Sequence, residues 1–211
     1  MVGRFSLSDQ AYDTIKTQLL AGAYRPGARL DAAVLAERHF WSVTPVRAAL
    51  HRLAGERFID ARPNEGFMAP LVTEASLKAL YDLSWGLLIH ALKIAAARQS
   101  APGYRAPNPP SPVATAPSPL VETERLFAAM GVAGNIEYAR AIVAVTERLR
   151  IARRLEPHLI ANIEGELGDL RNLFTSGASG ALDKAITTYH RRRGRLVPAL
   201  VAMIQDEALQ S

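Results

Sequence analysis

The chain has 211 residues, of which 49% are hydrophobic and 21% are charged, with a formal net charge of +5. This composition excludes wholesale disorder, and the lack of cysteine excludes disulfide scaffolds, cysteine-ligated zinc, iron–sulfur clusters and cysteine nucleophiles. No apolar run reaches the ~18–20 residues that cross a bilayer and the first residues lack the apolar core of a signal peptide, so we expect a cytoplasmic protein with no membrane partner.

Composition also divides the chain. Residues 101–119 contain seven of the 13 prolines, a density that no helix tolerates, and predict an extended loop. A proline-rich ligand for another protein is the alternative reading of that loop. Residues 1–73 are short mixed segments with a net charge of +2, and residues 74–211 are long helical segments with a net charge of +3. The basic character is therefore not concentrated in either part.

Two helices are predicted near the start of the chain. Ser8 is expected to cap a helix that runs to about Ala21, and a turn follows at residues 24–27. Asp31 is a natural N-cap for the second helix. Apolar residues at helical spacing are expected to face inward from these helices, namely Ala11, Ile15, Leu19, Leu20, Val34, Leu35 and Phe40.

A third helix is predicted to begin at Ser42 or Thr44 and to end near Gly55. Pro45 falls in its first turn, where proline is tolerated. Its inward residues are expected to be Val46, Leu50 and Leu53.

Two short alternating segments follow the third helix. Residues 57–61 and 66–70 read as strands joined by a turn over residues 62–66. Three helices followed by a hairpin form the layout of a winged helix-turn-helix domain, which we assign to residues 1–73.

Four short motifs occur in order along about 65 residues of this first part. They are Pro26-Gly27 with Leu30, Leu35-Ala36-Glu37-Arg38, Ser42-x-Thr44-Pro45-Val46-Arg47-x-Ala49-Leu50, and Arg62-Pro63-Asn64-x-Gly66. Each is weak alone, but together they resemble the DNA-binding domain of GntR-type transcriptional regulators. The resemblance implies that the domain binds double-stranded operator DNA. It also implies a homodimer whose two heads read half-sites about one helical turn apart.

The start of the third helix is the part that such a domain inserts into the major groove. Ser42 and Thr44 offer hydroxyl groups there, and Arg47 can reach a guanine or a phosphate. Arg52 lies deeper and suits either a phosphate contact or a surface charge. Residues 64–66 suit a minor-groove contact or merely a tight turn. The residues expected to bind DNA are Ser42, Val43, Thr44, Pro45, Arg47, Arg52, Asn64 and Gly66.

Three positions depart from the pattern of the family. The family usually has a basic residue at the position of Val43 and a glycine in the turn that Phe40-Trp41 fills. It also usually has a basic residue at the position of Glu65. These changes remove positive charge and should weaken the attraction to phosphate, while Val43 can touch a thymine methyl group instead. We therefore expect a different operator or a modest affinity.

Residues 74–211 predict an all-helical bundle. Thr73 is expected to cap a helix over residues 74–100, and further helices are expected over residues 119–131, 136–154, 156–175 and 179–208. A helical bundle after a GntR-type head resembles the FadR C-terminal (FCD) type of ligand-sensing and dimerisation domain. That resemblance implies a small-molecule effector.

Members of the FCD type commonly hold a divalent metal with one Asp and three His. In this chain residues 121–127 contain no histidine, Glu166-Leu167 stands where Glu-His is expected, and only His190 lies where a ligand would. Isolated histidines such as His90 and His158 are more typical of packed or solvated side chains. We therefore expect no metal and no other cofactor.

An effector pocket, if the bundle has one, should be apolar and near the first long helix. The candidate residues are Ser84, Trp85, Leu88 and His190, and ordinary core packing is the alternative for them. The basic runs at residues 148–154 and 191–195 predict solvated helix faces, with an anionic effector or additional DNA as alternatives.

The sequence thus predicts a mostly α-helical, dimeric transcriptional regulator, and in particular a repressor whose DNA affinity is modulated by an unidentified small molecule. A DNA-binding factor whose helical domain has lost effector control is the alternative. The sequence contains no recognisable pair of catalytic carboxylates, Ser/His arrangement or phosphate-binding glycine loop. We therefore expect that the protein is not an enzyme.

Overall fold

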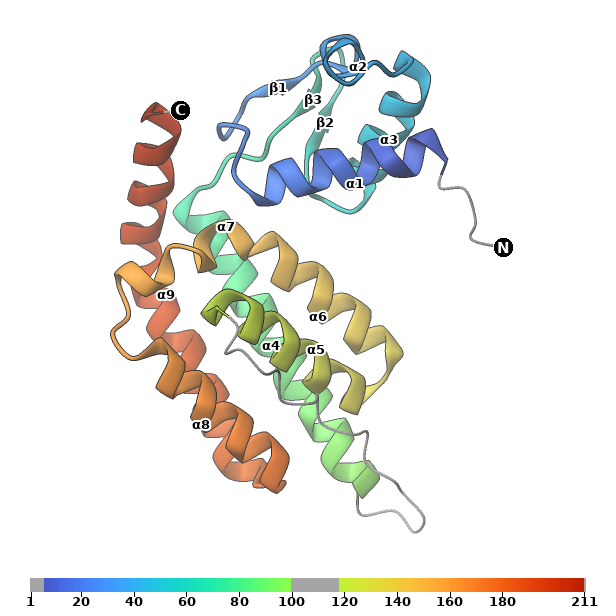
Figure 1. The fold of residues 1–211 in the computed structure, drawn as a ribbon. Coiled ribbons are helices and arrows are strands. Elements are labelled where there is room, and N and C mark those ends of the chain that lie inside the picture. The colour runs from blue at the N-terminus through green and yellow to red at the C-terminus, as the bar shows by residue number, and fades with distance from the viewer. Residues whose placement is uncertain (1–5, 100–117, 211) are drawn as a thin grey trace. The chain divides into compact units, whose positions relative to one another are not determined.

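The computed structural model describes residues 6–99 and 118–210, and it is mostly helical (Figure 1). The predicted proline-rich loop of residues 101–119 lies outside the described residues apart from Ser118 and Pro119. The chain divides into two compact units with a boundary between Val72 and Thr73. The first also includes the end of the chain from Ile204, and the second is Thr73–Met203.

The first unit contains three helices and a small sheet. Its elements are α1 (Leu7–Leu20), β1 (Arg29–Leu30), α2 (Ala32–His39), α3 (Val43–Gly55), β2 (Asp60–Arg62) and β3 (Gly66–Met68). The strands are antiparallel in the order β1-β3-β2, with Arg29 opposite Met68 and Ala61 opposite Phe67. The predicted helices and hairpin are present, and β1 adds a third strand to the sheet.

Side-chain caps fix the start of α1 and α2. Ser6, and not Ser8 as predicted, caps α1, because its hydroxyl accepts from the Asp9 amide at 3.2 Å while the Asp9 carboxylate accepts from the Ser6 amide at 3.3 Å. The Ser6 hydroxyl also donates to the Asp9 carboxylate at 2.7 Å, and this bond, together with that from the Ser6 amide, lowers the pKa of Asp9. Asp31 caps α2 as predicted, accepting from the Ala33 amide at 2.8 Å.

The core of the first unit lies between the three helices and the sheet. Its buried residues include Ala11, Tyr12, Ile15, Leu30, Leu35, Val46, Leu50, Leu53, Phe58 and Ile59. Two of the predicted inward residues are instead exposed, namely Val34 and Phe40. Phe40 is 97% exposed because it is the C-cap of α2, where its left-handed backbone (φ 56°) ends the helix and turns the side chain away from the core.

The second unit is built from helices α4 (Glu74–Gln99), α5 (Pro119–Gly134), α6 (Ile136–Arg148), α7 (Arg150–Arg153), α8 (Ile163–Ser176) and α9 (Ser179–Gln210), with a 3-10 turn at Glu156–His158. Thr73 caps α4 as predicted, since its hydroxyl accepts from the Ser76 amide at 3.1 Å. The predicted helix 136–154 is interrupted at Leu149. The predicted helix 156–175 begins only at Ile163. The 3-10 turn, which contains Pro157, comes before it, and Asn162, with a left-handed backbone, directly precedes the helix.

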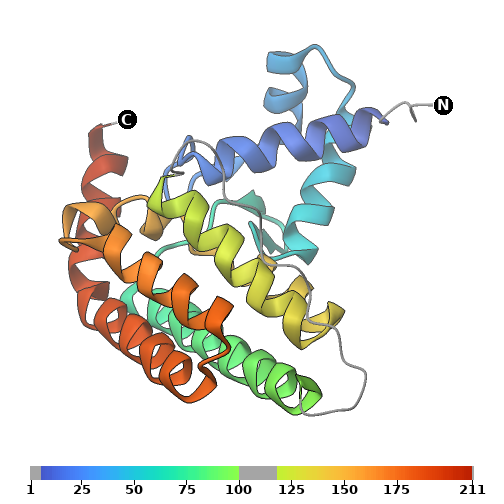
Figure 2. The ribbon, with the colours of Figure 1, turned by 60° about the horizontal axis from the view of Figure 1, so that its bottom comes forward.

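Helices α4, α5 and α6 approach one another closely, and α8 runs beside α9 (Figures 1 and 2). A Cβ atom on Gly131 would lie 2.8 Å from the Ala139 Cα of α6, and one on Gly134 would lie 2.9 Å from the Ala91 Cα of α4. Both glycines are buried, so the backbones touch at these points. The predicted break at Gly134-Asn135 is confirmed, because Asn135 caps α6 by accepting from the Glu137 amide at 2.9 Å.

The bundle interior is mostly apolar, but it also buries several polar and charged side chains. Its apolar core includes Leu88, Leu92, Leu126, Phe127, Met130, Ile142, Ile163, Leu167, Leu170, Ile186 and Tyr189. Arg153 and Arg193 are 2% and 0% exposed, so the prediction that both basic runs are solvated helix faces is wrong for these two residues. Their positions in α7 and α9 turn them into the bundle, while Arg191, Arg192 and Arg195 remain exposed.

Glu156 joins three helical elements through buried polar contacts. Its carboxylate accepts from the Arg193 Nε at 2.8 Å and from the Tyr81 hydroxyl at 2.8 Å. A second carboxylate oxygen, Oε2 of Glu166, lies 2.9 Å from the Arg193 Nη1. Because a buried charge is tolerated only when it is paired, this group ties the 3-10 turn to α4, α8 and α9.

Gly131→Ala should lower the free energy of unfolding by about 1–3 kcal/mol, because the new methyl group overlaps the backbone of α6. Gly194→Ala is the matched control, since no atom lies within 4 Å of a Cβ there and the change should raise helix stability by up to about 1 kcal/mol. Urea denaturation of both variants measures the difference. Equal effects would mean that α5 and α6 do not touch at Gly131.

Glu156→Gln should destabilise the protein by about 3 kcal/mol, because it removes a fully buried partner of Arg193 while keeping the shape of the side chain. Glu137→Gln, in an exposed pair with Arg140, should leave the free energy of unfolding nearly unchanged. Chemical denaturation at neutral pH tests both. A stability of Glu156→Gln within error of the parent protein would refute the role given to this ion pair.

Candidate nucleic-acid interface

Helix α3 presents its first turn to solvent. Val46, Ala49, Leu50 and Leu53 are buried against the rest of the first unit, so the opposite side of α3 faces outward. Ser42, Val43, Thr44 and Arg47 are exposed and Pro45 is half-buried in this outward turn. Ser42 occupies the N-cap position, but neither its hydroxyl nor that of Thr44 caps the helix, which corrects the expectation of a side-chain cap there. The backbone amides at this end carry the positive end of the helix dipole.

The turn between β2 and β3 forms the second part of the outward surface. Asn64 and Gly66 are exposed and have φ angles of 64° and 87°, so both occupy the left-handed region that lets the chain turn back sharply. Arg62 and Glu65 form an ion pair of 3.2 Å across this turn. The turn therefore exposes the amide side chain of Asn64 and the backbone of Gly66, which no side chain covers.

Helix α3 and the hairpin enclose an open groove of about 440 Å³, which we call the α3–wing groove. Its lining includes Arg29, Asp31, Arg47, His51, Arg62, Asn64, Gly66 and Phe67. Three of the residues predicted to bind DNA, Arg47, Asn64 and Gly66, are thus brought together although they are up to 19 positions apart in the chain.

The α3–wing groove contains basic residues that the sequence analysis did not select. Arg29 reaches it because β1 pairs with β3, and Arg62 reaches it from the end of β2. His51 lies one turn after Arg47 on α3 and packs edge-on against Phe67 at 4.9 Å. The place of Arg29 in this groove depends on the pairing of β1 with β3, and no local sequence pattern predicts that pairing.

One carboxylate moderates the positive charge of the groove. Hydrogen bonds from the Ala33 and Val34 amides lower the pKa of Asp31, and the charge of Arg29, with a nitrogen 3.9 Å away, acts in the same direction. Asp31 therefore stays ionised at neutral pH. The charge of Arg47 also acts on Asp31 in this direction, and the guanidinium of Arg47 forms no ion pair within 4.0 Å among the described residues.

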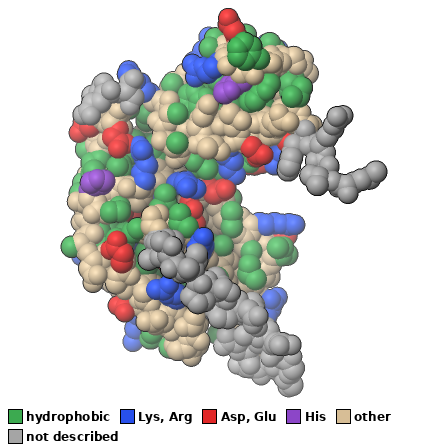
Figure 3. Space-filling model, viewed as in Figure 1, with side chains coloured by type: hydrophobic (Ala, Val, Ile, Leu, Met, Phe, Trp, Pro, Cys, Tyr) green, Lys and Arg blue, Asp and Glu red, His purple; other side chains and the backbone are tan. Residues whose placement is uncertain are grey.

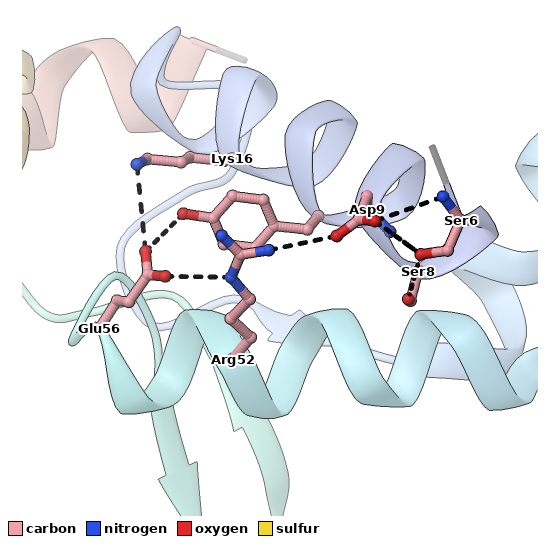
Figure 4. Close-up of polar contacts among 7 residues, drawn as sticks. Ser6, Ser8, Asp9, Lys16, Arg52 and Glu56 are labelled. Atoms are coloured by element: carbon pink, nitrogen blue, oxygen red, sulfur yellow. Dashed lines mark hydrogen bonds and ion pairs between the residues drawn. The ribbon is translucent and has the colours of Figure 1, made fainter. Parts of the chain in front are cut away.

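Arg52 lies in a different polar cluster, between α1 and α3 (Figure 4). Its guanidinium stacks on the Tyr12 ring at 3.7 Å and forms ion pairs with Asp9 at 3.4 Å and with Glu56 at 3.2 Å. Glu56 also accepts from the Tyr12 hydroxyl and lies 4.0 Å from the Lys16 Nζ. Of the two alternatives for Arg52, these contacts favour a structural residue over a phosphate contact.

Charged side chains are mixed over the surface. On the face shown in Figure 3, Lys and Arg side chains alternate with Asp and Glu instead of forming one large basic patch. Hydrophobic side chains are exposed near the start of α3, where Val43 is accessible and Phe40 stands free of the core. The outward surface at the start of α3 therefore combines apolar with basic side chains.

Three of the four predicted effector residues are buried in the helical unit, and the fourth lies at its surface. Ser84, Leu88 and His190 are buried, and the Ser84 hydroxyl lies 3.1 Å from the His190 Nε2. Trp85 points to the surface instead, where its indole nitrogen donates to Thr187 at 3.1 Å. Burial lowers the pKa of His190 to about 3, so its imidazole is neutral at physiological pH.

Within residues 6–99 and 118–210, no three His, Asp or Glu side chains lie close enough together to hold a metal ion. His190 is surrounded by Phe127 at 5.9 Å and Tyr189 at 5.0 Å between ring centroids, and not by further ligands. The absence of a metal cofactor stays a prediction. No helix in the described part of the chain combines the length and the hydropathy needed to cross a membrane.

Comparisons with known proteins identify the family of the first unit. Residues 7–68 match the family model described as "Bacterial regulatory proteins, gntR family". The HTH-type transcriptional regulator McbR of Escherichia coli is 37% identical over 90 residues, which cover 43% of this chain and 41% of McbR. The Nta operon transcriptional regulator of Aminobacter aminovorans is 27% identical over 140 residues, covering 63% of this chain and 67% of that protein.

Solved structures extend the likeness to the helical unit. E. coli McbR/YncC superposes with a TM-score of 0.63 at 20% identity, covering 93% of this chain and 99% of that one. A putative GntR transcriptional regulator from Rhodococcus sp. RHA1 gives a TM-score of 0.62 at 14% identity, covering 91% of this chain and 97% of that one. These structures confirm the predicted fold class, a helix-turn-helix head followed by a helical domain.

The family model and the two relatives describe transcriptional regulators and not enzymes, in agreement with the prediction for this chain. The sequence match to McbR spans about two fifths of that protein, whereas the family match coincides with the unit that carries the α3–wing groove. Residues 7–68 thus resemble the DNA-binding domain of GntR-type transcriptional regulators, as the sequence motifs predicted.

Proposed function

We propose that this protein is a cytoplasmic, homodimeric repressor that binds double-stranded operator DNA through the α3–wing groove and is released by a small molecule bound in its helical unit. The observation that carries the proposal is the convergence of Arg29, Arg47 and Arg62 with Asn64 and Gly66 in one open groove of the family domain. Helix α3 inserts its exposed first turn into the major groove, and the hairpin follows the adjacent backbone.

Each part of the groove has a chemical role in this proposal. Arg47 reads a guanine or pairs with a phosphate, because its five donors suit both. Ser42 and Thr44 contact phosphate through hydroxyls that the helix does not use, and Val43 contacts a thymine methyl group. Pro45 holds the first turn rigid. Arg29 and Arg62 contribute phosphate contacts from the strands.

A homodimer is supported by an apolar face on the helical unit. Helices α5 and α6 form an open groove of about 350 Å³ that is lined by Ala128, Val132, Ala139, Arg140, Val143, Ala144 and Glu147. Val132 and Val143 are exposed on it, and Ile136 is exposed where α6 begins. Exposed apolar side chains gathered on one face are typical of a protein–protein interface, and a second copy would bring two heads to one operator.

The helical unit is proposed to be an FCD-type domain that binds an effector. The support is its length, its helix order and the likeness of its fold to that of McbR. Among the predicted effector residues, Ser84, Leu88 and His190 suit an internal site, whereas the exposed Trp85 suits it less well.

Arg47→Ala should weaken binding to a preferred duplex by about 5- to 150-fold, equivalent to about 1–3 kcal/mol, because a side chain that reads a base is lost. The duplex is first selected from a random pool with the parent protein, and Kd is then measured by fluorescence anisotropy. Lys78→Ala, at an exposed basic residue of α4 outside both grooves, is the control. Unchanged affinity in Arg47→Ala would remove this residue from the interface and refute the proposed docking of α3.

Val43→Arg should raise the affinity for non-specific DNA and increase the salt dependence, log Kd against log salt, by about one unit, because it adds one phosphate contact. It should also change the sequence selected from a random pool. Leu83→Arg adds the same charge at an exposed position of α4 and should change neither property. Identical salt dependences for Val43→Arg, Leu83→Arg and the parent protein would mean that the start of α3 does not enter the groove of DNA.

A further inference from the structure

We propose that Phe40 is a further DNA contact of this protein, whose ring touches the 5-methyl group of a thymine in the major groove beside the start of α3. The inference rests on the proposed function, because it names another residue of the same interface and the base chemistry that this residue selects. It starts from a side chain that the packing of the first unit does not explain.

Phe40 is the most exposed of the large apolar side chains that the structure describes. Its exposed fraction is 97%, and the next largest value is 62%, for Ile136. The adjacent Trp41 is half-buried, packs against the core of the first unit and stacks on His39 with 4.6 Å between the ring centroids. The core therefore uses the ring of Trp41 and leaves the ring of Phe40 in water, which is unfavourable for an apolar group.

The backbone of Phe40 is also unfavourable for this residue. Its φ and ψ angles of 56° and 38° lie in the left-handed region, where a Cβ atom is crowded and glycine is the usual choice. The turn requires this conformation, because the Phe40 amide donates to the Glu37 carbonyl at 3.2 Å and the Trp41 amide donates to the Ala36 carbonyl at 2.9 Å. Glycine would form the same turn with less strain. A strained and exposed ring that the turn does not need therefore indicates a use outside the folded unit.

The position of Phe40 in the chain brings its ring to the start of α3. Ser42 is the N-cap of α3, so the Cα atoms of Phe40 and Ser42 are at most about 7 Å apart. Val43, the first residue of α3, is also exposed. The major groove of B-DNA is about 12 Å wide, so a helix that enters it by its first turn carries the preceding residues to the groove as well.

The chemistry of Phe40 and Val43 favours a methyl group over a phosphate. Neither side chain has a charge or a hydrogen-bond donor, so neither can pair with a phosphate oxygen. Within the major groove, the apolar group that base pairs display is the 5-methyl group of thymine. The exposed side chains of Ser42, Thr44 and Arg47 adjoin this apolar pair, and their hydroxyl and guanidinium groups suit a DNA backbone or base edge better than an apolar protein surface.

The test removes thymine methyl groups one at a time. A preferred duplex is selected with the parent protein, and each thymine is then replaced by deoxyuridine, which pairs with adenine but lacks the methyl group. The parent protein should bind about 3- to 10-fold more weakly at each contacted thymine, as measured by fluorescence anisotropy. Phe40→Gly should lose the response at one thymine of each half-site and keep the response at the thymine that Val43 contacts.

Phe40→Gly should also raise the Tm of the free protein by about 2–4 °C, because glycine relieves the left-handed strain and no packing is lost. Phe40→Asn is a second variant, since asparagine tolerates this backbone and is less flexible than glycine. It should lose the same thymine response, which separates the loss of the ring from a gain in flexibility. Leu83→Ala removes an exposed apolar side chain of α4 and should keep every thymine response.

A parent protein that responds to no deoxyuridine, or a Phe40→Gly variant that keeps every response of the parent, would overturn the proposal. If Phe40→Gly weakened binding to thymine and uracil duplexes by the same factor, the ring would contact the sugar–phosphate backbone, and the proposal would be wrong. A change in self-association with unchanged DNA binding would assign Phe40 to a protein contact and would also overturn it. Selection that yields no preferred duplex would refute the proposed function itself, whereas the other results refute only the role of Phe40.

Discussion

The orientation of α3 depends on the burial of one of its faces. Val46, Leu50 and Leu53 are fully buried in the first unit, and Ala49 is almost so. Because a helix has a fixed period of 3.6 residues, burying these positions turns Arg47 and the first turn outward. The pairing of β1 with β3 then adds Arg29 to the same surface. The α3–wing groove is therefore a consequence of core packing, and its functional side chains add little to the stability of the fold.

Buried charge is the corresponding constraint in the helical unit. Arg193 is compensated by Glu156 and Glu166, and this pairing connects the 3-10 turn to two long helices. Arg153 lies in the same bundle without such compensation. The contrast matters, because a fully paired network is compatible with a stable bundle whereas an unpaired buried cation opposes folding.

The sequence predicted the helices, the hairpin and most of the core, because those features follow from periodicity and capping residues close together in the chain. It misplaced the first cap because Ser6 and Ser8 are equivalent in composition, and only the reciprocal bond to Asp9 distinguishes them. It treated Phe40 as core because local spacing does not reveal a left-handed cap. Arg153 and Arg193 were read as solvated because a basic run does not indicate which of its members a bundle buries. Long-range contacts, such as those of Arg52 with Asp9 and Tyr12, were beyond any local pattern.

The central claim is that the α3–wing groove is the surface that holds DNA. Hydrogen–deuterium exchange of the full chain, with and without a selected duplex, tests it most directly. If DNA occupies this groove, backbone amides in residues 42–48 and 62–67 exchange more slowly when the duplex is present, and those of α8 are unchanged. Protection confined to the helical unit, with the start of α3 and the hairpin unaffected by saturating DNA, would contradict it.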